Sequence, residues 1–506
     1  MARDGGLRVA LRRMAWIGLV LLGSAVLRLA RAADDPRSAR FAAAAAKVLA
    51  RKELDGSTVG IELRSLTRDT RVWSRNATHS FAPASNMKLV TLCLSLSILG
   101  PDWNFETPLI AGGPVVAGGR LEGDLWIRGG GDPTLAPCFF ESEDENSPLQ
   151  PFVQALTLQG IRHVRGDLVV DDRAFDRQFI PEGWPQNQLA EEYAAPVAAL
   201  SLNGNCLHVR VTSHPGGSPP GAELRPPVFG WRLLSELTAA GNGSQFLVAV
   251  VPPDSQGCVR IRGSVGAEVG VATARQPVAD PPLFFANALR AALERAGITF
   301  GGTVRRAADG EQPDAKGKTL FTRRSPLIPA LQRCGKESDN TIAEHLLKCC
   351  AAVRFGQGTD ERGAELVQEL AKEVGVAPGQ VVTVDGSGLS HVDQVTPAFL
   401  AAVLAKAYAA PWRDEFVRCL PISGVDGTLE KRMTEAALQY RVRAKTGFIK
   451  EVSALSGYAL AGEPGDQEVF AFSFVINGFK GANAEMKKIQ DDLCRAVVAL
   501  PRAAGE

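Results

Sequence analysis

The sequence predicts an α+β protein in which helices pack on an antiparallel sheet assembled from both ends of the chain. Near the start, a helical stretch precedes two strand-like segments, and near the end, two strand-like segments precede an amphipathic helix. The long interior has a different composition, with glycine turns and short apolar runs. The simplest architecture is therefore a helix-and-sheet domain with a large β-rich insertion.

Hydrophobic periodicity predicts the elements of the first part. Residues 38–53 have the alanine-rich composition of a helix. Residues 57–64 and 70–75 alternate between apolar and polar on either side of a polar turn, as a hairpin would. Residues 85–99 are apolar on nearly every side and predict a helix buried in a core, which Gly100-Pro101 ends.

The remaining elements follow from the same patterns. Strands are expected at 124–128, 167–171, 452–461 and 467–476, and helices at 340–353, 360–373 and 481–499. A chain of 506 residues is too long for one core, because single cores stop growing near roughly 250 to 300 residues. We predict a leader at 1–32, a first part of the sheet domain at 33–105, a β-rich insertion of two subdomains at 106–320 and a second part of the sheet domain at 321–506.

The first 32 residues have the features of a secretory signal peptide. Arginines precede an apolar run from Met14 to Leu27, and Ala30-Arg31-Ala32 follows as a cleavage site. An uncleaved membrane anchor is the alternative, but the run of 14 residues is shorter than the roughly 18 to 20 that span a bilayer. We therefore expect an exported protein, periplasmic or associated with the cell envelope, with no stable transmembrane anchor.

Charge and cysteine content exclude several kinds of partner. The whole chain carries +1 and residues 1–32 carry six arginines and one aspartate, a net +5, so the chain beyond them carries −4. This balance argues against nucleic acid as a partner, because phosphate binding requires a basic face. The nine cysteines leave at least one thiol unpaired and form no C-x-x-C pattern, and H-E-x-x-H is also absent, so no metal or other cofactor is predicted.

Three short motifs along the chain contain the candidate catalytic and substrate-binding residues. They are Ser85-Asn86-Met87-Lys88, Ser338-Asp339-Asn340 and Lys445-Thr446-Gly447. A serine hydroxyl is a weak nucleophile until a base removes its proton, and a lysine three positions later on a helix lies one turn away on the same face. Ser85 and Lys88 therefore predict a nucleophile and its general base. An apolar setting and a second cation such as Lys445 would both lower the pKa of Lys88 toward the range a base needs.

The other motif residues also have structural interpretations. Ser338 and Asn340 precede a predicted helix, where short polar residues form ordinary caps. Beside Ser85 and Lys88, the hydroxyl of Ser338 becomes a proton relay to the leaving amine, and Asn340 holds the lysine and the substrate amide. Asp339 is expected to point away.

The third motif suits the binding of a substrate. Lys445 and Thr446 offer two hydrogen bonds to a substrate carboxylate. Gly447 has no side chain, so an extended peptide can lie against the strand. The backbone N–H groups of Ser85 and Phe448 would stabilise a developing oxyanion.

These residues resemble a known family, the low-molecular-mass class C penicillin-binding proteins, which are D-alanyl-D-alanine carboxypeptidases and endopeptidases of bacterial cell-wall metabolism. The likeness extends through residues 83–89 (PASNMKL), 129–135 (GGGDPTL), 166–171 (GDLVVD), 193–201 (YAAPVAALS), 338–340 (SDN), 385–390 (DGSGLS), 424–429 (GVDGTL) and 443–447 (RAKTG).

The resemblance implies a β-lactamase/transpeptidase-like catalytic domain, with the stretch between the first two motifs forming additional domains. It implies Ser85 as the acyl-enzyme nucleophile, Lys88 as general base, Ser338 as relay and Lys445 as a substrate contact. One position departs from the family pattern: the residue after Gly447 is commonly a hydroxyl residue, and here it is Phe448. A hydroxyl that binds the substrate carboxylate is thereby lost.

The leading hypothesis is a serine DD-peptidase that acts on peptidoglycan stem peptides through a Ser85 acyl-enzyme and is inhibited by β-lactam antibiotics. A β-lactamase, which releases the penicillin rapidly, is the alternative among enzymes. A penicillin-binding scaffold or sensor with little catalysis is the alternative from another class. The balance of carboxypeptidase and endopeptidase action, the disulfide pairing and the oligomeric state stay open.

Overall fold

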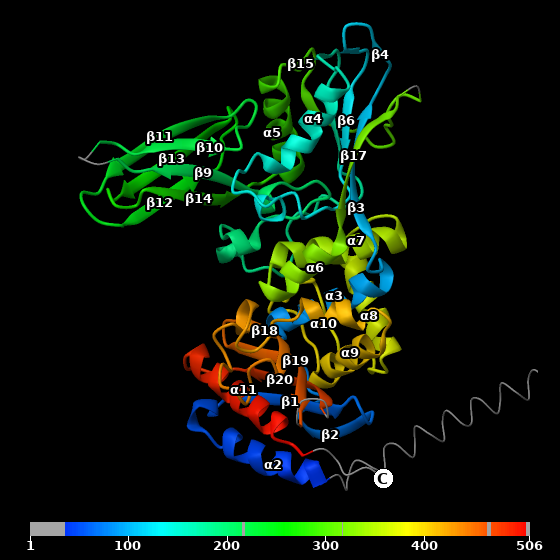
Figure 1. The fold of residues 1–506 in the computed structure, drawn as a ribbon, viewed down its shortest axis with the longest axis vertical. Coiled ribbons are helices and arrows are strands. Elements are labelled where there is room, and N and C mark those ends of the chain that lie inside the picture. The colour runs from blue at the N-terminus through cyan, green and yellow to red at the C-terminus, as the bar shows by residue number, and fades with distance from the viewer. Residues whose placement is uncertain (1–35, 215–217, 316, 463–466, 502–506) are drawn as a thin grey trace, which may run out of the picture. The chain divides into compact units, whose positions relative to one another are not determined.

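The computed structural model describes residues 36–214, 218–315, 317–462 and 467–501 (Figure 1). The predicted leader at 1–32 lies outside these residues. Contacts divide the chain into two compact units: the first holds the described residues up to Asn86, Val395–Ala410 and the described residues from Leu420, and the second holds the rest. The boundaries predicted near 105 and 320 stay predictions. Among the described residues, no helix is both long enough and apolar enough to cross a bilayer.

The first unit contains a five-stranded antiparallel sheet built from both ends of the chain. Its strands are β1 Thr58–Ser65, β2 Thr70–Arg75, β18 Val442–Ile449, β19 Val452–Ala461 and β20 Glu468–Asn477. The order is β18-β19-β20-β1-β2, and Ile61 of β1 lies opposite Phe474 of β20. The pairing of β1 with β20 joins the N-terminal hairpin to the C-terminal strands, as the sequence predicts.

Helices cover both faces of this sheet. They are α2 Pro36–Leu49, α9 Pro397–Ala409 and α11 Asn483–Val498. The helices α2 and α11 lie side by side (Figure 1) and share one core with Ile61 and Leu455. Tyr458 lies three residues after Leu455 in β19, so its side chain is on the opposite face of the sheet. Its hydroxyl donates to Leu404 O of α9 at 2.8 Å. Because strand side chains alternate, α9 covers the opposite face.

The second unit contains a group of helices around α3. They are α3 Met87–Ile98, α6 Leu327–Lys336, α7 Asn340–Phe355, α8 Asp360–Glu373 and α10 Arg413–Cys419. The helix α3 packs against the other four, and its residues from Met87 to Leu96 are all buried. It begins two residues later than predicted, because Ala84–Asn86 form a tighter 3-10 turn.

The rest of the second unit is rich in short strands. They are β3 Asn104–Ala111, β4 Val115–Val116, β5 Arg120–Leu121, β6 Leu125–Arg128, β7 His163–Val164, β8 Leu168–Asp171, β9 Cys206–Thr212, β10 Gly221–Arg225, β11 Arg232–Ala239, β12 Phe246–Val251, β13 Cys258–Val265, β14 Val271–Pro277, β15 Thr299–Phe300, β16 Val304–Arg306 and β17 Thr319–Pro326. They form four sheets, ordered β16-β8-β6-β3-β17, β15-β7-β5-β4, β10-β9-β14 and β11-β13-β12.

Two helices in this region were not predicted, α4 Gln150–Leu158 and α5 Pro281–Arg295. The start of α5 carries a clear sequence signal: Asp280 accepts a hydrogen bond from Leu283 N, and prolines occupy the first two helical positions. The prediction of a β-rich region is therefore correct, but it omits these two helices.

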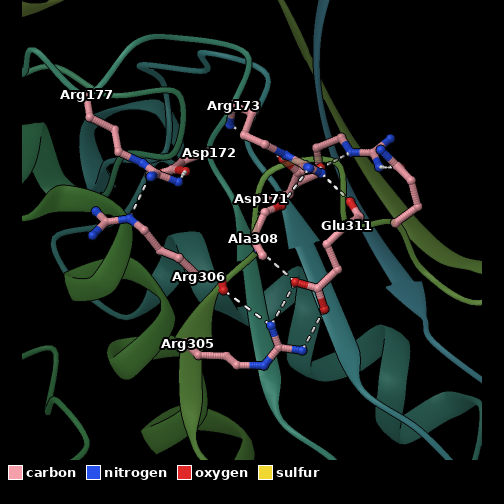
Figure 2. A network of polar contacts seen from close by, with 10 residues as sticks. Asp171, Asp172, Arg173, Arg177, Arg305, Arg306, Ala308 and Glu311 are labelled. Atoms are coloured by element: carbon pink, nitrogen blue, oxygen red, sulfur yellow. Dashed lines mark hydrogen bonds and ion pairs between the residues drawn. The ribbon is translucent and has the colours of Figure 1, made fainter.

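Ion pairs hold the parallel strands β8 and β16 together (Figure 2). Arg306 donates to Asp172 at 2.8 Å and to Asp280, the cap of α5, at 2.6 Å. The neighbouring Arg305 contacts both oxygens of Glu311, at 2.8 and 3.0 Å. The shared guanidinium of Arg306 fixes β16 between the end of β8 and the start of α5.

None of the nine cysteines, all of which lie in the described residues, forms a disulfide. Eight of them are buried, including Cys93 in α3 and the pair Cys349-Cys350 in α7. In these positions the three thiols pack as small hydrophobic side chains.

A buried ion pair attaches α2 to the sheet of the first unit. Arg37 and Glu468 have side chains only 1% and 2% exposed, and Glu468 also accepts a hydrogen bond from Ser65. Removing one partner leaves a buried charge without its counterion, so Arg37→Ala should lower the free energy of unfolding by about 3–5 kcal/mol. Arg51→Ala breaks a more exposed pair with Asp492 and should cost about 1 kcal/mol or less. Urea unfolding of both variants makes the comparison, and equal losses would contradict it.

Candidate active site

The amine of Lys88 is fully buried in the second unit and has two carbonyl partners. Its Nζ donates to Asn340 Oδ1 at 2.6 Å and to Ser387 O at 2.8 Å. Burial lowers the pKa of Lys88, and the nearby Cys334, Asp385, Glu344 and Asp339 oppose that shift. A buried amine with a lowered pKa suits a base that accepts a proton near neutral pH.

The side chain of Asn340 is oriented by a second contact. Its Nδ2 donates to Tyr193 O at 2.9 Å, so its Oδ1 faces Lys88. Tyr193 belongs to one of the strings that carry the family resemblance, but the sequence indicated no role for it. Because the contact is made by a backbone carbonyl, no side-chain pattern could have revealed it.

Asp339 is the residue that caps α7. Its Oδ1 accepts from Ile342 N at 3.1 Å and from Thr341 Oγ1 at 2.8 Å. The alternative interpretation of Ser338 and Asn340 as ordinary caps is therefore wrong. Since Asp339 satisfies the end of the helix, the amide of Asn340 is available to Lys88.

In the first unit, the turn that contains Ser85 packs against the third motif. Asn86 Nδ2 donates to Lys445 O at 3.1 Å. A Cβ added to Gly447 would lie 2.9 Å from Asn86 Nδ2 and 2.9 Å from Pro83 O. A glycine is needed here because the turn itself occupies the space of a side chain, which adds a structural reason to the predicted role in peptide binding.

The other residues of the third motif lie along β18, an edge strand of the sheet. Lys445 is buried and its Nζ donates to Thr446 O at 2.9 Å. Thr446 Oγ1 donates to Thr428 Oγ1 at 2.8 Å. Phe448 has 56% of its surface exposed, so its ring lies at the surface beside the motif.

Two motif segments contain a residue in the left-handed region that L side chains seldom adopt. Ala84, directly before Ser85, has φ +47°, and Ser338 has φ +64°. Each such conformation costs on the order of 1–3 kcal/mol and is concentrated at functional sites. Ser85 is half-buried, as is Ser338. The strain marks both serines as candidates for function, while their individual roles stay predictions.

The structure thus connects the first motif to each of the other two. Lys88 contacts Asn340 within the second unit, and Asn86 contacts Lys445 within the first. Residues 85–88 form one continuous segment that supplies both contacts. The three motifs did not predict a contribution from Ser387, whose backbone oxygen also accepts from Lys88 Nζ. The string 385–390 was noticed in the sequence, but its contribution comes from the backbone.

Glu344 generates a prediction about pH. It is buried on α7, accepts from Gly386 N at 2.7 Å, and burial together with Asp385 raises its pKa to about 8. In the unfolded chain it ionises near 4.5, so between these pH values folding takes up a proton and the wild type loses stability as pH rises. Glu344→Gln keeps an acceptor for Gly386 N and cannot ionise. Its stability relative to wild type should therefore increase from pH 5 to pH 8.

Urea unfolding at several pH values measures this difference. Glu369→Gln, on the exposed face of α8, is the control and should show no such trend. A stability difference for Glu344→Gln that does not change with pH would contradict the prediction.

Comparisons with known proteins identify the family of the chain. A family model described as the D-Ala-D-Ala carboxypeptidase 3 (S13) family matches residues 41–498. The chain is 30% identical over 497 residues to a D-alanyl-D-alanine carboxypeptidase of Actinomadura sp. (strain R39), covering 95% of this chain and 89% of that protein. It is 27% identical over 448 residues to the D-alanyl-D-alanine carboxypeptidase DacB of Haemophilus influenzae, covering 87% and 89%.

Solved structures show the same similarity. The crystal structure of penicillin binding protein 4 (dacB) from Haemophilus influenzae superposes with a TM-score of 0.74 at 25% identity, covering 90% of this chain and 99% of that one. A crystal structure of the same protein complexed with a novel β-lactam gives a TM-score of 0.69 at 24% identity, with the same coverage. The predicted fold class and the predicted family are both confirmed, and the chain belongs to the D-Ala-D-Ala carboxypeptidase 3 (S13) family.

Proposed function

We propose that this chain is a serine DD-peptidase that cleaves the D-Ala-D-Ala bond of peptidoglycan stem peptides through an acyl-enzyme on Ser85. The contact between the buried Lys88 amine and Asn340 supports the proposal, because an amine of lowered pKa in the first motif lies beside the second motif and could act as the base. Membership of the D-Ala-D-Ala carboxypeptidase 3 (S13) family supports the same reaction and substrate class.

Acylation begins with transfer of the Ser85 hydroxyl proton to the neutral amine of Lys88. The Ser85 oxygen attacks the carbonyl carbon of the penultimate D-alanine, and the carbonyl oxygen becomes an oxyanion. Backbone N–H groups of Ser85 and Phe448 stabilise that oxyanion, each donor worth about 3 kcal/mol. When the tetrahedral intermediate collapses, the C–N bond breaks and the leaving amine takes a proton relayed through Ser338.

Hydrolysis completes the cycle. Water attacks the ester carbon and gives one proton to the base, the ester bond to Ser85 breaks, and the serine oxygen recovers a proton. A penicillin follows the first half of this path, since its strained amide acylates Ser85 in the same way. The opened ring stays attached to the ester and obstructs the incoming water, so the acyl-enzyme persists.

The third motif is proposed to bind the substrate. Lys445 and Thr446 hold the carboxylate of the terminal D-alanine, and the edge of β18 accepts the extended peptide. Asn340 contacts the substrate amide in addition to Lys88. Export to the periplasm or cell envelope is part of the same proposal, because the substrate lies there and residues 1–32 have the pattern of a signal peptide.

A fluorescent penicillin tests the function directly. Wild-type protein should carry a label that survives denaturing gel electrophoresis and decays slowly, and Ser85→Ala should carry none. Ser235→Ala, which removes an exposed hydroxyl from β11, is the matched control and should label as wild type does. Rapid loss of a Ser85-dependent label would identify a β-lactamase, and absence of label from wild type would identify a non-catalytic scaffold. Either result overturns the proposal.

Phe448 is proposed to shift the substrate range away from free terminal D-alanine. A hydroxyl at this position would add a hydrogen bond to the substrate carboxylate, and the exposed ring of Phe448 cannot. Cleavage of cross-linked peptides would then be relatively more important than removal of the last residue from a free stem peptide.

Phe448→Thr should therefore raise kcat/KM for a D-Ala-D-Ala peptide by up to about 10-fold, the value of one added hydrogen bond to a charged group. Phe448→Ala removes the ring without adding a hydroxyl, so it separates steric relief from hydrogen bonding. The measurement is D-alanine release from a diacetylated tripeptide and from a cross-linked dimer. No gain for the threonine variant over the alanine variant would contradict this role for Phe448.

A further inference from the structure

The loop of residues 385–390 is built around the buried carboxylate of Asp385, which is 1% exposed. One oxygen, Oδ1, accepts from Ser387 N at 3.0 Å and Gly388 N at 2.5 Å. The other, Oδ2, accepts from Ser390 N at 2.8 Å and from the indole of Trp184 at 3.0 Å. Four N–H donors match the acceptor capacity of an ionised carboxylate, and charge-assisted hydrogen bonds are the strong ones. The shape of the loop is therefore fixed by this one side chain.

Both neighbouring helices of the second unit hold the same loop. Thr91 Oγ1 of α3 donates to Gly386 O at 2.6 Å, and Glu344 of α7 accepts from Gly386 N at 2.7 Å. The next residue, Ser387, points its carbonyl oxygen at Lys88 Nζ. The position of that oxygen thus depends on the Asp385 carboxylate from one side and on α3 and α7 from the other.

Two carbonyl oxygens constrain the orientation of the Lys88 amine. Asn340 Oδ1 and Ser387 O can only accept, and both lie within hydrogen-bond distance of Nζ. Each carbonyl can therefore take one N–H bond of the amine. A shift of either oxygen would change the direction in which the amine points.

Two further buried acids lie near Asp385. Burial, together with Asp385, raises the pKa of Asp393 well above its ordinary value, and Asp393 accepts from Val384 N at 2.8 Å. Burial also raises the pKa of Glu344 to about 8. The four N–H donors gathered on Asp385 are what distinguishes it from these two neighbours.

We propose that Asp385 is a positioning residue for acylation: by fixing the 385–390 loop, it aims the Ser387 carbonyl at the Lys88 amine and so orients the amine that takes the Ser85 proton. This inference rests on the proposed function and deepens it. Trp184, whose indole donates to the same carboxylate, supports Asp385 from outside the three motifs.

Asp385→Asn tests the inference because the added NH₂ group would face N–H donors and the loop would have to rearrange. The rate constant for acylation by a fluorescent penicillin should fall about 100-fold, the effect of an approximately 1 Å misplacement of a catalytic group, while the dissociation constant for the unreacted penicillin changes little. Asp393→Asn is the matched control. The amide oxygen of asparagine can keep the hydrogen bond from Val384 N, so labelling should stay within a few-fold of wild type.

The pH profile separates positioning from a general loosening of the fold. The groups facing Lys88 are Cys334 on α6, Asp339 and Glu344 at α7, and Asp385. Losing the Asp385 charge removes an influence that raises the pKa of Lys88, so the acid limb of the acylation profile should move to lower pH. General loosening would instead admit water, restore the pKa of Lys88 toward its ordinary value and move the limb to higher pH.

Two further measurements keep the test decisive if Asp385→Asn is unstable. Trp184→Phe removes one donor while keeping an aromatic ring and should lower the acylation rate in the same direction by a smaller factor. Hydrogen exchange should show lost protection at 385–390 in Asp385→Asn and retained protection in Asp393→Asn. Wild-type acylation rates in both Asp385→Asn and Trp184→Phe overturn the inference and leave the proposed function standing, whereas unlabelled wild-type protein overturns the function itself.

Discussion

The buried amine of Lys88 is the interaction on which the rest of the site depends. Taking a charge-bearing group out of water costs several kcal/mol unless acceptors surround it. The helix α3 is buried on every side around Lys88. Two acceptors of the amine come from distant segments, Asn340 at the start of α7 and Ser387 in the loop beyond α8. Both segments contact the same nitrogen atom, which constrains their relative positions. The helices packed around α3 bury the amine, and this burial lowers its pKa.

A second constraint is the close approach of β18 to the turn before α3. Gly447 leaves room that Asn86 and Pro83 fill, and the same turn includes Ala84 with a positive φ. A side chain at Gly447 would displace the turn, and with it the segment that carries Ser85. Strain at Ala84 persists because packing on both sides holds it in place. Ser85 thus lies in a turn with little freedom to move, and in the proposed reaction a serine held in this way loses less entropy when it reacts.

Sequence reasoning predicted the regular part of the fold and the identities of the motif residues. Segments with a clear period, such as β19, α7 and α8, agree closely with the expected ranges. It missed α6, α9 and α10 in the C-terminal part of the chain, and it missed α4 and α5 within a region dominated by turns. It also left open whether Ser338 and Asn340 cap α7, and it did not predict that Asp339 forms the cap. The structure shows that Asp339 accepts from Ile342 N and that Asn340 Oδ1 accepts from Lys88. The contributions of Ser387 and Tyr193 come from backbone carbonyls, which no pattern of side chains encodes.

The carboxyl groups near Lys88 give a physical reason for burying acids next to an amine. Burial alone lowers the pKa of a lysine. Nearby acidic groups, Asp385 among them, oppose that shift, so the pKa of Lys88 falls less than burial alone would lower it. Burial and the neighbouring Asp385 raise the pKa of Glu344 to about 8 and the pKa of Asp393 well above its ordinary value, because charged carboxylates in one buried region repel each other. The loop at 385–390 joins two effects in one residue, since the carboxylate that opposes the shift of Lys88 also fixes the backbone of Ser387, whose oxygen contacts the same amine.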